Sequence, residues 1–217
     1  MPYSYSSQTV LLTGASAGIG MQFARALAAR GASLVLVARR QDRLDTLADE
    51  LRRDHGVTVD VLAADLSSPT AGADLKARVD ALGVTVTSVI NNAGFGTFGP
   101  FIDEDPTLLE QEIAVDVVTP VQLTFAFLPD LLASGKGFLI NVASMAAYTP
   151  TPRMAVYGAA KAFVLSFTES LWAELRDTGV TVFALSPGAT STEFNTVVGT
   201  DDATAGATPR TPDDVVA

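Results

Sequence analysis

The sequence predicts an α/β fold in which a doubly wound parallel β-sheet is covered by helices on both faces. Short, continuously apolar runs alternate with segments of helical periodicity through most of the 217 residues. A glycine-rich loop joins the first apolar run to the first helical segment. Continuous apolar runs are typical of strands buried on both faces, and helices must connect such parallel strands. We therefore expect three layers, α/β/α, in a single domain over residues 1–217.

Six strands and five helices are expected in alternation. The strands are short and mainly apolar: Thr9–Thr13, Ser33–Ala38, Val57–Leu62, Ser88–Asn91, Gly137–Ala143 and Val180–Leu185. The helices are expected between or before them, at Ile19–Arg30, Arg40–His55, Ala71–Leu82, Thr107–Ala133 and Ala155–Arg176. Pro120 and Pro129 should kink or divide the fourth helix, because proline removes a helical hydrogen bond.

The last part of the sequence has a different composition. Residues 191–210 are rich in Thr, Ala, Gly and Asp and are expected to form a mobile loop. Thr211-Pro-Asp-Asp then has a capping hydroxyl, a proline at the first helical position and acids in the first turn, which predicts a helix start. The sequence stops about one and a half turns later. We therefore expect the C-terminal helix to be incomplete.

Composition narrows the classes of function. The 14 Lys and Arg against 24 Asp and Glu give a net charge of −10, which opposes binding to nucleic acid or an anionic membrane. The absence of cysteine excludes disulfides and thiolate-metal sites, and we expect no metal. With no secretion signal and no run of 18 apolar residues, the expectation is a cytoplasmic protein without a membrane span. An anionic cofactor would have to be held by local groups.

A phosphate-binding loop directly follows the first strand. Its sequence is Thr13-Gly-Ala-Ser-Ala-Gly-Ile-Gly20, and it opens the first helix. Glycine lets a phosphate approach the backbone, and the helix N-terminus favours an anion. A glycine turn alone can be structural, but its place between strand and helix indicates a dinucleotide site. The second strand ends in Arg39-Arg40, which suits the 2′-phosphate of NADP, although the two arginines could instead lie at a solvated helix start.

Three further residues predict the chemistry. Tyr157 and Lys161 are four residues apart on one helix face, and Ser144 lies just beyond the fifth strand. A phenol has a pKa of about 10, and a nearby ammonium favours its ionised form, so Tyr157 could serve as general acid or base. Ser144 could donate a hydrogen bond to the substrate oxygen.

With these motifs the chain resembles the short-chain dehydrogenase/reductase family in its compact, Rossmann-like, single-domain form. The resemblance covers Gln8 to Ala217 and implies an NADP(H)-dependent oxidoreductase acting on CH–OH and C=O groups. Ser144, Tyr157 and Lys161 match the catalytic serine, tyrosine and lysine, and Tyr157 and Lys161 also border the nicotinamide ribose. The other implied cofactor-binding residues are Gly14, Ser16, Gly18, Ile19 and Gly20 at the pyrophosphate, Arg39 (the primary contact) and Arg40 at the 2′-phosphate, Asp65 and Leu66 at the adenine, Asn91, Ala93 and Gly94 at the adenosine ribose, and Pro187, Gly188, Thr190 and Thr192 at the nicotinamide.

The chain departs from the family pattern at two places. Asp116 stands where the family usually has an asparagine that helps hold a water near the lysine, so a second charge enters near Lys161. Family members also continue with a complete C-terminal helix and a last strand, which help to form the substrate pocket and one subunit contact. The resemblance implies a homodimer or homotetramer in which the helices at 107–133 and 155–176 pair between subunits.

The sequence leaves more than one substrate class and more than one function open. Phe95, Phe98, Tyr148 and Met154 flank the catalytic motifs and could form the wall of a hydrophobic substrate site. Asp116 and the short C-terminus would also fit a catalytically weak NADP(H)-binding sensor or regulatory subunit. A third alternative is an epimerase or dehydratase that regenerates its cofactor.

Overall fold

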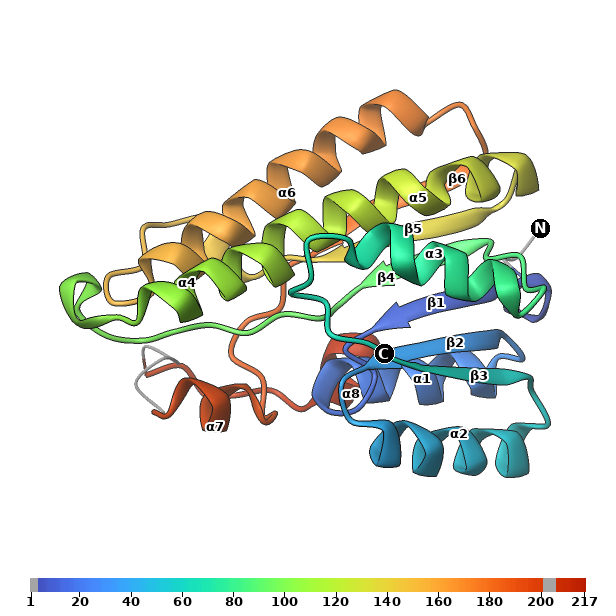
Figure 1. Cartoon of the computed structure of the whole chain (residues 1–217), viewed down its shortest axis with the longest axis horizontal. Helices are drawn as coiled ribbons and strands as arrows, with labels where there is room; N and C mark the ends of the chain where they lie inside the picture. The colour runs from blue at the N-terminus through green and yellow to red at the C-terminus, as the bar shows by residue number, and fades with distance from the viewer. Residues whose placement is uncertain (1–3, 201–205) are drawn as a thin grey trace.

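The structure is a computed structural model that describes residues 4–200 and 206–217 (Figure 1). Six parallel strands form one sheet in the order β3-β2-β1-β4-β5-β6. The strands are β1 (Thr9–Thr13), β2 (Ser33–Ala38), β3 (Val59–Ala63), β4 (Ser88–Asn91), β5 (Gly137–Val142) and β6 (Val180–Leu185). The chain runs outward from β1 to β3 and then returns to β4 beside β1, so the sheet is doubly wound, as predicted.

Helices cover both faces of the sheet (Figure 1). One core holds residues of α1 (Gly18–Ala29) and α2 (Gln41–His55), packed against strand residues that include Leu12 and Leu34. The opposite core holds residues of α3 (Ala71–Ala81), α5 (Thr119–Ser134) and α6 (Ala155–Leu175), packed against Leu11 and Val35. Neighbouring strand residues therefore point to opposite faces, and both faces are apolar because both are buried.

Four of the five predicted helices begin and end within two residues of their expected bounds. The fourth consists of α4 (Pro106–Ile113), the π-helical turn η3 (Ala114–Val118) and α5. Pro120 has no N–H to donate to the carbonyl four residues earlier, and the wider turn ends two residues before it, at Val118. Pro129 lies inside α5 without ending it. The predicted division is thus confirmed near Pro120, and Pro129 is contained within one helix.

The helical stretch Pro106–Ser134 is long and apolar enough to cross a membrane, and it is the one such helix among the described residues. This segment is not an unbroken apolar run, because polar and charged residues interrupt it. In the structure Leu123, Phe127 and Leu131 of this stretch pack on the sheet. A core helix passes the same test of length and composition, so the finding is weak evidence for a membrane segment.

The segment after β6 contains more structure than the expected mobile loop. Thr190 pairs with Arg210 in an isolated bridge, and a short helix α7 spans Phe194–Val198. Residues 201–205 lie outside the described part of the chain. The helix predicted at Thr211 is confirmed as α8 (Pro212–Val216), where the Thr211 hydroxyl accepts the N–H of Asp214. Three short 3-10 turns complete the described chain: η1 (Tyr5–Ser7), η2 (Phe101–Asp103) and η4 (Met145–Ala147).

Candidate active site

The glycine loop lies at the carboxyl end of β1, next to the turn that follows β4. Gly14 has φ of 67° and Gly18 has φ of 54°, in the region that disfavours side chains. A Cβ on Gly20 would lie 2.3 Å from the carbonyl oxygen of Gly14, so only glycine allows this close approach. The Thr13 hydroxyl accepts the N–H groups of Asn92 and Ala93, each at 3.0 Å, and thereby joins the two loops. The result is a cradle of exposed backbone at a helix start.

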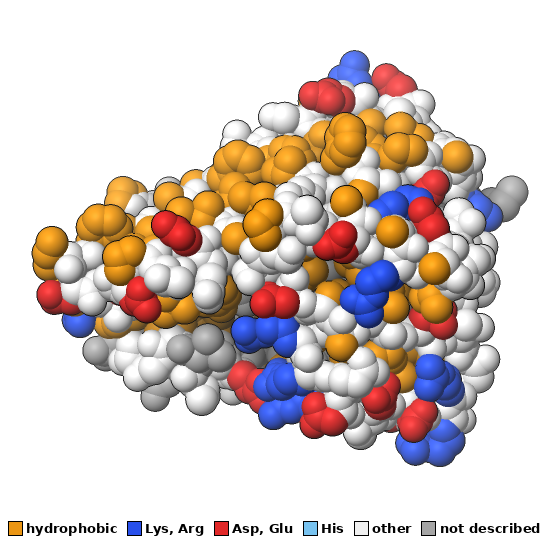
Figure 2. Space-filling view, viewed as in Figure 1, with side chains coloured by type: hydrophobic (Ala, Val, Ile, Leu, Met, Phe, Trp, Pro, Cys, Tyr) orange, Lys and Arg blue, Asp and Glu red, His pale blue; other side chains and the backbone are white. Residues whose placement is uncertain are grey.

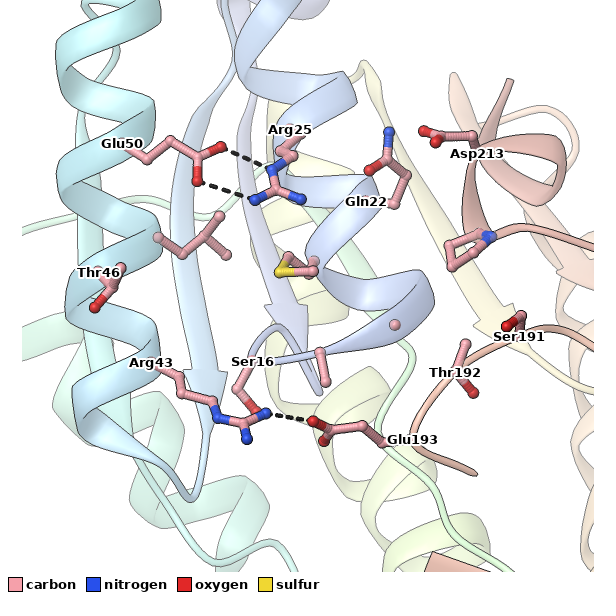
Figure 3. A pocket seen from close by; sticks show the side chains of 15 residues that line it. Ser16, Gln22, Arg25, Arg43, Thr46, Glu50, Ser191, Thr192, Glu193 and Asp213 are labelled. Carbon is pink, nitrogen blue, oxygen red and sulfur yellow. Dashed lines mark hydrogen bonds and ion pairs between the residues drawn. The ribbon is translucent and has the colours of Figure 1, made fainter. Parts of the chain in front are cut away.

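An anion-binding cluster lies beside this cradle. Arg40 donates to the Ser16 hydroxyl at 3.1 Å and to the Glu193 carboxylate at 2.8 Å. Arg43 donates to the other oxygen of Glu193 at 2.6 Å, and Figure 3 draws this pair. The two arginines hold the pKa of Glu193 below its usual value. A carboxylate thus occupies the point where two guanidinium groups and a hydroxyl converge.

Arg39 and Asp65 lie in more open surroundings. The Arg39 side chain is exposed. The Ser67 backbone and hydroxyl hold the pKa of Asp65 below its usual value, with a smaller contribution from the charge of Arg39. Leu66 is buried, and its carbonyl accepts a hydrogen bond from Thr119. Of the two arginines after β2, Arg40 is therefore the one engaged with the glycine loop.

Asn91 faces the interior of the protein. Its amide donates to Asn141 at 2.8 Å and to Thr124 at 3.3 Å, and only 4% of the residue is exposed. Its amide N–H groups are therefore taken up by core partners, and its Oδ1 atom is buried without a hydrogen-bond partner among the described residues. The buried side chain leaves the backbone of Asn91 as the part that could border a ribose. Ala93 and Gly94 continue this turn toward Lys161, since a Cβ on Gly94 would meet the Lys161 ammonium at 3.1 Å.

The predicted catalytic residues come together at the ends of β5 and α6. The Lys161 ammonium lies 5.5 Å from the centroid of the Tyr157 ring and donates to the carbonyl of Val142 at 3.2 Å. Ser144 caps η4 by accepting the N–H of Ala146 at 3.1 Å, and its hydroxyl also hydrogen-bonds with Tyr157. These contacts agree with the i, i+4 spacing that placed Tyr157 and Lys161 on one helix face.

The electrostatics around Tyr157 differ from the simple expectation of a lowered pKa. Burial raises the pKa of Tyr157, and although the Lys161 ammonium and Ser144 act in the opposite direction, the net pKa lies above that of a free phenol. Asp116 and Glu112 add to the rise. Burial lowers the pKa of Lys161, but Asp116, Tyr157 and Glu112 outweigh it and leave the pKa raised. Lys161 therefore carries its charge while Tyr157 keeps its proton.

Asp116 lies next to Lys161, as the resemblance implied. Its Oδ1 atom is 3.7 Å from the Lys161 ammonium, and only 1% of the residue is exposed. A Cβ on Gly94 would lie 2.4 Å from the same oxygen, so glycine is required there. Burial raises the pKa of Asp116 to about 6, against the opposing effect of Lys161.

The segment after β6 crosses the open side of the site. The carbonyl of Pro187 accepts the N–H of Met145 at 3.0 Å, and a Cβ on Gly18 would lie 2.9 Å from Thr192. Thr190 donates to the carbonyl of Gly188 and shapes the turn. Ile19, in the first turn of α1, is partly buried against the core on the α1 side of the sheet.

A cleft of about 610 Å³ lies between α1, α2 and the segment after β6 (Figure 3). It is bordered by Ser16 and Gly18 of the glycine loop, by Arg43, and by the Arg25–Glu50 ion pair. Ser144, Tyr157 and Lys161 are not part of its lining. This cleft thus belongs to the phosphate end of the site and not to the catalytic end.

Four residues of the site were not predicted from the sequence: Arg43, Glu112, Glu193 and Phe194. The Phe194 ring lies 5.2 Å from that of Tyr157. Glu193 and Phe194 directly follow Thr192, and Glu112 precedes Asp116 by one helical turn. Their closeness in sequence to predicted site residues is the signal that could have identified Glu112, Glu193 and Phe194.

Comparison with known proteins gives a consistent result. The family described as short chain dehydrogenase matches residues 8–203. A curated short chain dehydrogenase from Pseudocercospora fijiensis is 38% identical over 189 residues, which cover 86% of this chain and 61% of the relative. The chain therefore spans less than two thirds of that relative's length.

Solved structures are similar over a larger share of their length. A short-chain dehydrogenase from Sphingobium yanoikuyae in complex with NADPH has a TM-score of 0.89 and 38% identity, covering 96% of this chain and 81% of that one. The bulky-bulky ketone specific alcohol dehydrogenase from Comamonas testosteroni has a TM-score of 0.85 and 34% identity, covering 97% and 80%. Both similarities cover nearly the whole of this chain.

Proposed function

Because this chain belongs to the short-chain dehydrogenase family, we propose that it is an oxidoreductase that uses NADP(H) to interconvert a carbonyl and an alcohol. The observation that carries the proposal is the convergence of Ser144, Tyr157 and Lys161 at the mouth of a glycine cradle. Family membership supports a nicotinamide cofactor, and the relative crystallised with NADPH supports the choice of NADP(H).

Each catalytic side chain has one task in this proposal. Tyr157 gives its proton to the substrate oxygen during reduction and takes it back during oxidation. Lys161 stays charged and stabilises the phenolate that remains when Tyr157 loses its proton. Ser144 accepts an N–H from Ala146, and its own O–H, which hydrogen-bonds with Tyr157 in this structure, would donate to the substrate oxygen when a substrate is bound. The cofactor, when bound, supplies or receives the hydride.

The residues on the cofactor side fit a dinucleotide with a 2′-phosphate. The cradle around Gly14, Gly18 and Gly20 offers backbone N–H groups at a helix start, which suits a pyrophosphate. Arg40 and Ser16, with Arg43, would hold the 2′-phosphate, and the Glu193 carboxylate is the stand-in anion that supports this assignment. Asp65 and Leu66 would border the adenine, and Pro187, Gly188, Thr190 and Thr192 would border the nicotinamide.

The substrate side is apolar, which supports a hydrophobic ketone or alcohol. A Cβ on Gly96 would lie 3.0 to 3.3 Å from Tyr157, Phe194 and Met154, so these three side chains converge on one point. Phe98 lies nearby under the guanidinium of Arg153, at 4.5 Å. The similarity to an alcohol dehydrogenase specific for bulky ketones points to the same substrate class.

The direct test is turnover by the purified chain. With NADPH and a panel of bulky ketones, we expect oxidation of the cofactor, with deuterium from labelled NADPH appearing on the carbinol carbon of the product. NADH should support a lower kcat/KM. Tight NADPH binding without turnover on any ketone or alcohol would refute the enzyme and favour the alternative of a cofactor-binding sensor.

The outer face of α5 and α6 supports a proposal for the oligomeric state. Hydrophobic side chains gather over α4, α5 and α6 in Figure 2, and Phe125, Trp172 and Phe163 are 83%, 56% and 44% exposed. Such a patch is typical of a protein interface. We propose that two copies of the chain pair through this face.

Phe125→Asp should then weaken the dimer by about tenfold or more, because a charge replaces a ring that the proposed pairing would bury. Light scattering after gel filtration, over a range of protein concentrations, measures the change. Leu82→Asp, at the end of α3, is the matched control and should leave the mass unchanged. An unchanged mass for both variants would contradict the proposed pairing.

A further inference from the structure

Glu112 on α4 is fully buried although it belongs to no ion pair among the described residues. Its exposed fraction is 0%, and its Oε2 atom accepts the N–H of Thr97 at 3.1 Å. Its Oε1 atom is buried without a hydrogen-bond partner in the part of the chain that the structure describes. An ionised carboxylate in this position would leave a charged oxygen unsatisfied, which is costly in a protein interior.

The neighbours of Glu112 make ionisation still less favourable. Asp116 lies one turn further along the same helical stretch, and Glu104 approaches from the segment after η2. On α6, the charge of Glu112 raises the pKa values of both Lys161 and Tyr157. Asp116 is the carboxylate nearest to the single buried ammonium, at 3.7 Å. One ammonium balances one carboxylate, so a second negative charge beside it is uncompensated.

We propose that Glu112 is a positioning residue that carries a proton in the working protein, so that Asp116 alone balances Lys161. Burial and the two nearby acids raise the pKa of Glu112 to about 7, which is consistent with this assignment. The two carboxyl groups and Lys161 then titrate as a coupled set. The inference rests on the proposed roles of Tyr157 and Lys161 only for its effect on turnover.

The proton on Glu112 would control the reaction through Tyr157. When pH rises through the pKa of Glu112, its proton leaves to solvent and a negative charge appears beside the cluster. That charge raises the pKa of Tyr157. Alcohol oxidation requires Tyr157 in its ionised form, which then accepts the proton of the alcohol. Because ionised Glu112 raises the pKa of Tyr157, it moves alcohol oxidation toward higher pH. Carbonyl reduction, which needs protonated Tyr157, is preserved.

Glu112→Gln tests this, because glutamine has nearly the same shape, still accepts the Thr97 N–H and cannot ionise. We expect the rise of alcohol oxidation with pH to move to lower pH, because the charge that opposes Tyr157 ionisation is absent. Near pH 6, where Glu112 is protonated in the native chain, turnover should stay within about threefold of wild type. Glu110→Gln, an exposed acid on the same helix, should leave the profile unchanged.

Infrared spectroscopy tests the proton without any turnover. The native protein near pH 6 should have buried carboxylic-acid carbonyl absorption, of which Glu112→Gln removes the part due to Glu112 and Glu110→Gln removes none, while the part due to Asp116 persists in both variants. Loss of the part due to Glu112 in the native protein as pH rises through about 7 would support the inference even if Glu112→Gln folds poorly. Identical infrared spectra for native protein and Glu112→Gln, or superimposable pH profiles, would overturn it. An inactive chain that still has the absorption due to Glu112 would leave Glu112 as assigned and refute the proposed enzyme instead.

Discussion

Tyr157→Phe is expected to lower turnover by about 10³-fold or more while NADPH still binds. The substitution removes the one proton that the proposed reaction exchanges with the substrate oxygen. It keeps the ring, which packs against Phe194 with the centroids 5.2 Å apart, so the surroundings should be preserved. The measurement is kcat on the best ketone of the panel, together with the dissociation constant of NADPH from a fluorescence titration.

The matched control is Tyr5→Phe, which removes a phenol hydroxyl at η1, far along the chain from the site. It should leave kcat and NADPH binding at wild-type values. Normal turnover by Tyr157→Phe would refute the proposed acid–base role. Loss of NADPH binding along with turnover would show that the hydroxyl is needed to hold the cofactor, so the loss of turnover could not be assigned to proton transfer.

The sheet could be predicted from the sequence because each strand is specified by its own residues. Runs such as Ser33–Ala38 are apolar without interruption, and strands buried on both faces need that pattern. Tyr157 and Lys161 were predictable for the same reason, because helical spacing places them on one face. Local patterns therefore predicted correctly the architecture and the helix that carries Tyr157 and Lys161.

What the sequence could not predict depends on contacts between distant segments. Glu112 is a charged residue on a helix, and such residues usually face solvent. In the structure the loop that carries Thr97 covers it. Glu193 lies 150 residues from Arg43, and no local pattern pairs them. The choice between Arg39 and Arg40 also depends on which side chain turns toward Ser16, and neighbouring residues in a sequence do not reveal this.

The segment after β6 is a further example. Its composition predicted a mobile loop, yet Thr190 pairs with Arg210 and Glu193 is held by two arginines. Phe194, the next residue, lies against Tyr157. Adjacent residues of one segment therefore contact both the anion-binding cluster and Tyr157.

Arg40→Ala is expected to weaken NADPH binding by about 10- to 100-fold, since each hydrogen bond to a charged group contributes about 1.5–3 kcal/mol. Binding of NADH, which lacks the 2′-phosphate, should change little. Arg43→Ala should have a smaller effect, because its guanidinium is paired with Glu193 but does not contact Ser16. Fluorescence titrations of both cofactors against each variant measure the preference.

Glu193→Gln should act in the opposite direction. Its carboxylate competes for the two arginines that the 2′-phosphate would bind, and its removal should tighten NADPH binding by up to about fivefold, as expected for partly exposed ion pairs. Arg53→Ala, on the last turn of α2, removes one positive charge as Arg40→Ala and Arg43→Ala do, so it controls for net charge in those variants and should leave both affinities unchanged. If Arg39→Ala abolished the preference and Arg40→Ala did not, the 2′-phosphate would bind at Arg39, as the sequence first indicated. If native protein bound NADPH and NADH equally, the anion-binding cluster would have a purely structural role, in which Glu193 holds the segment after β6 against α2.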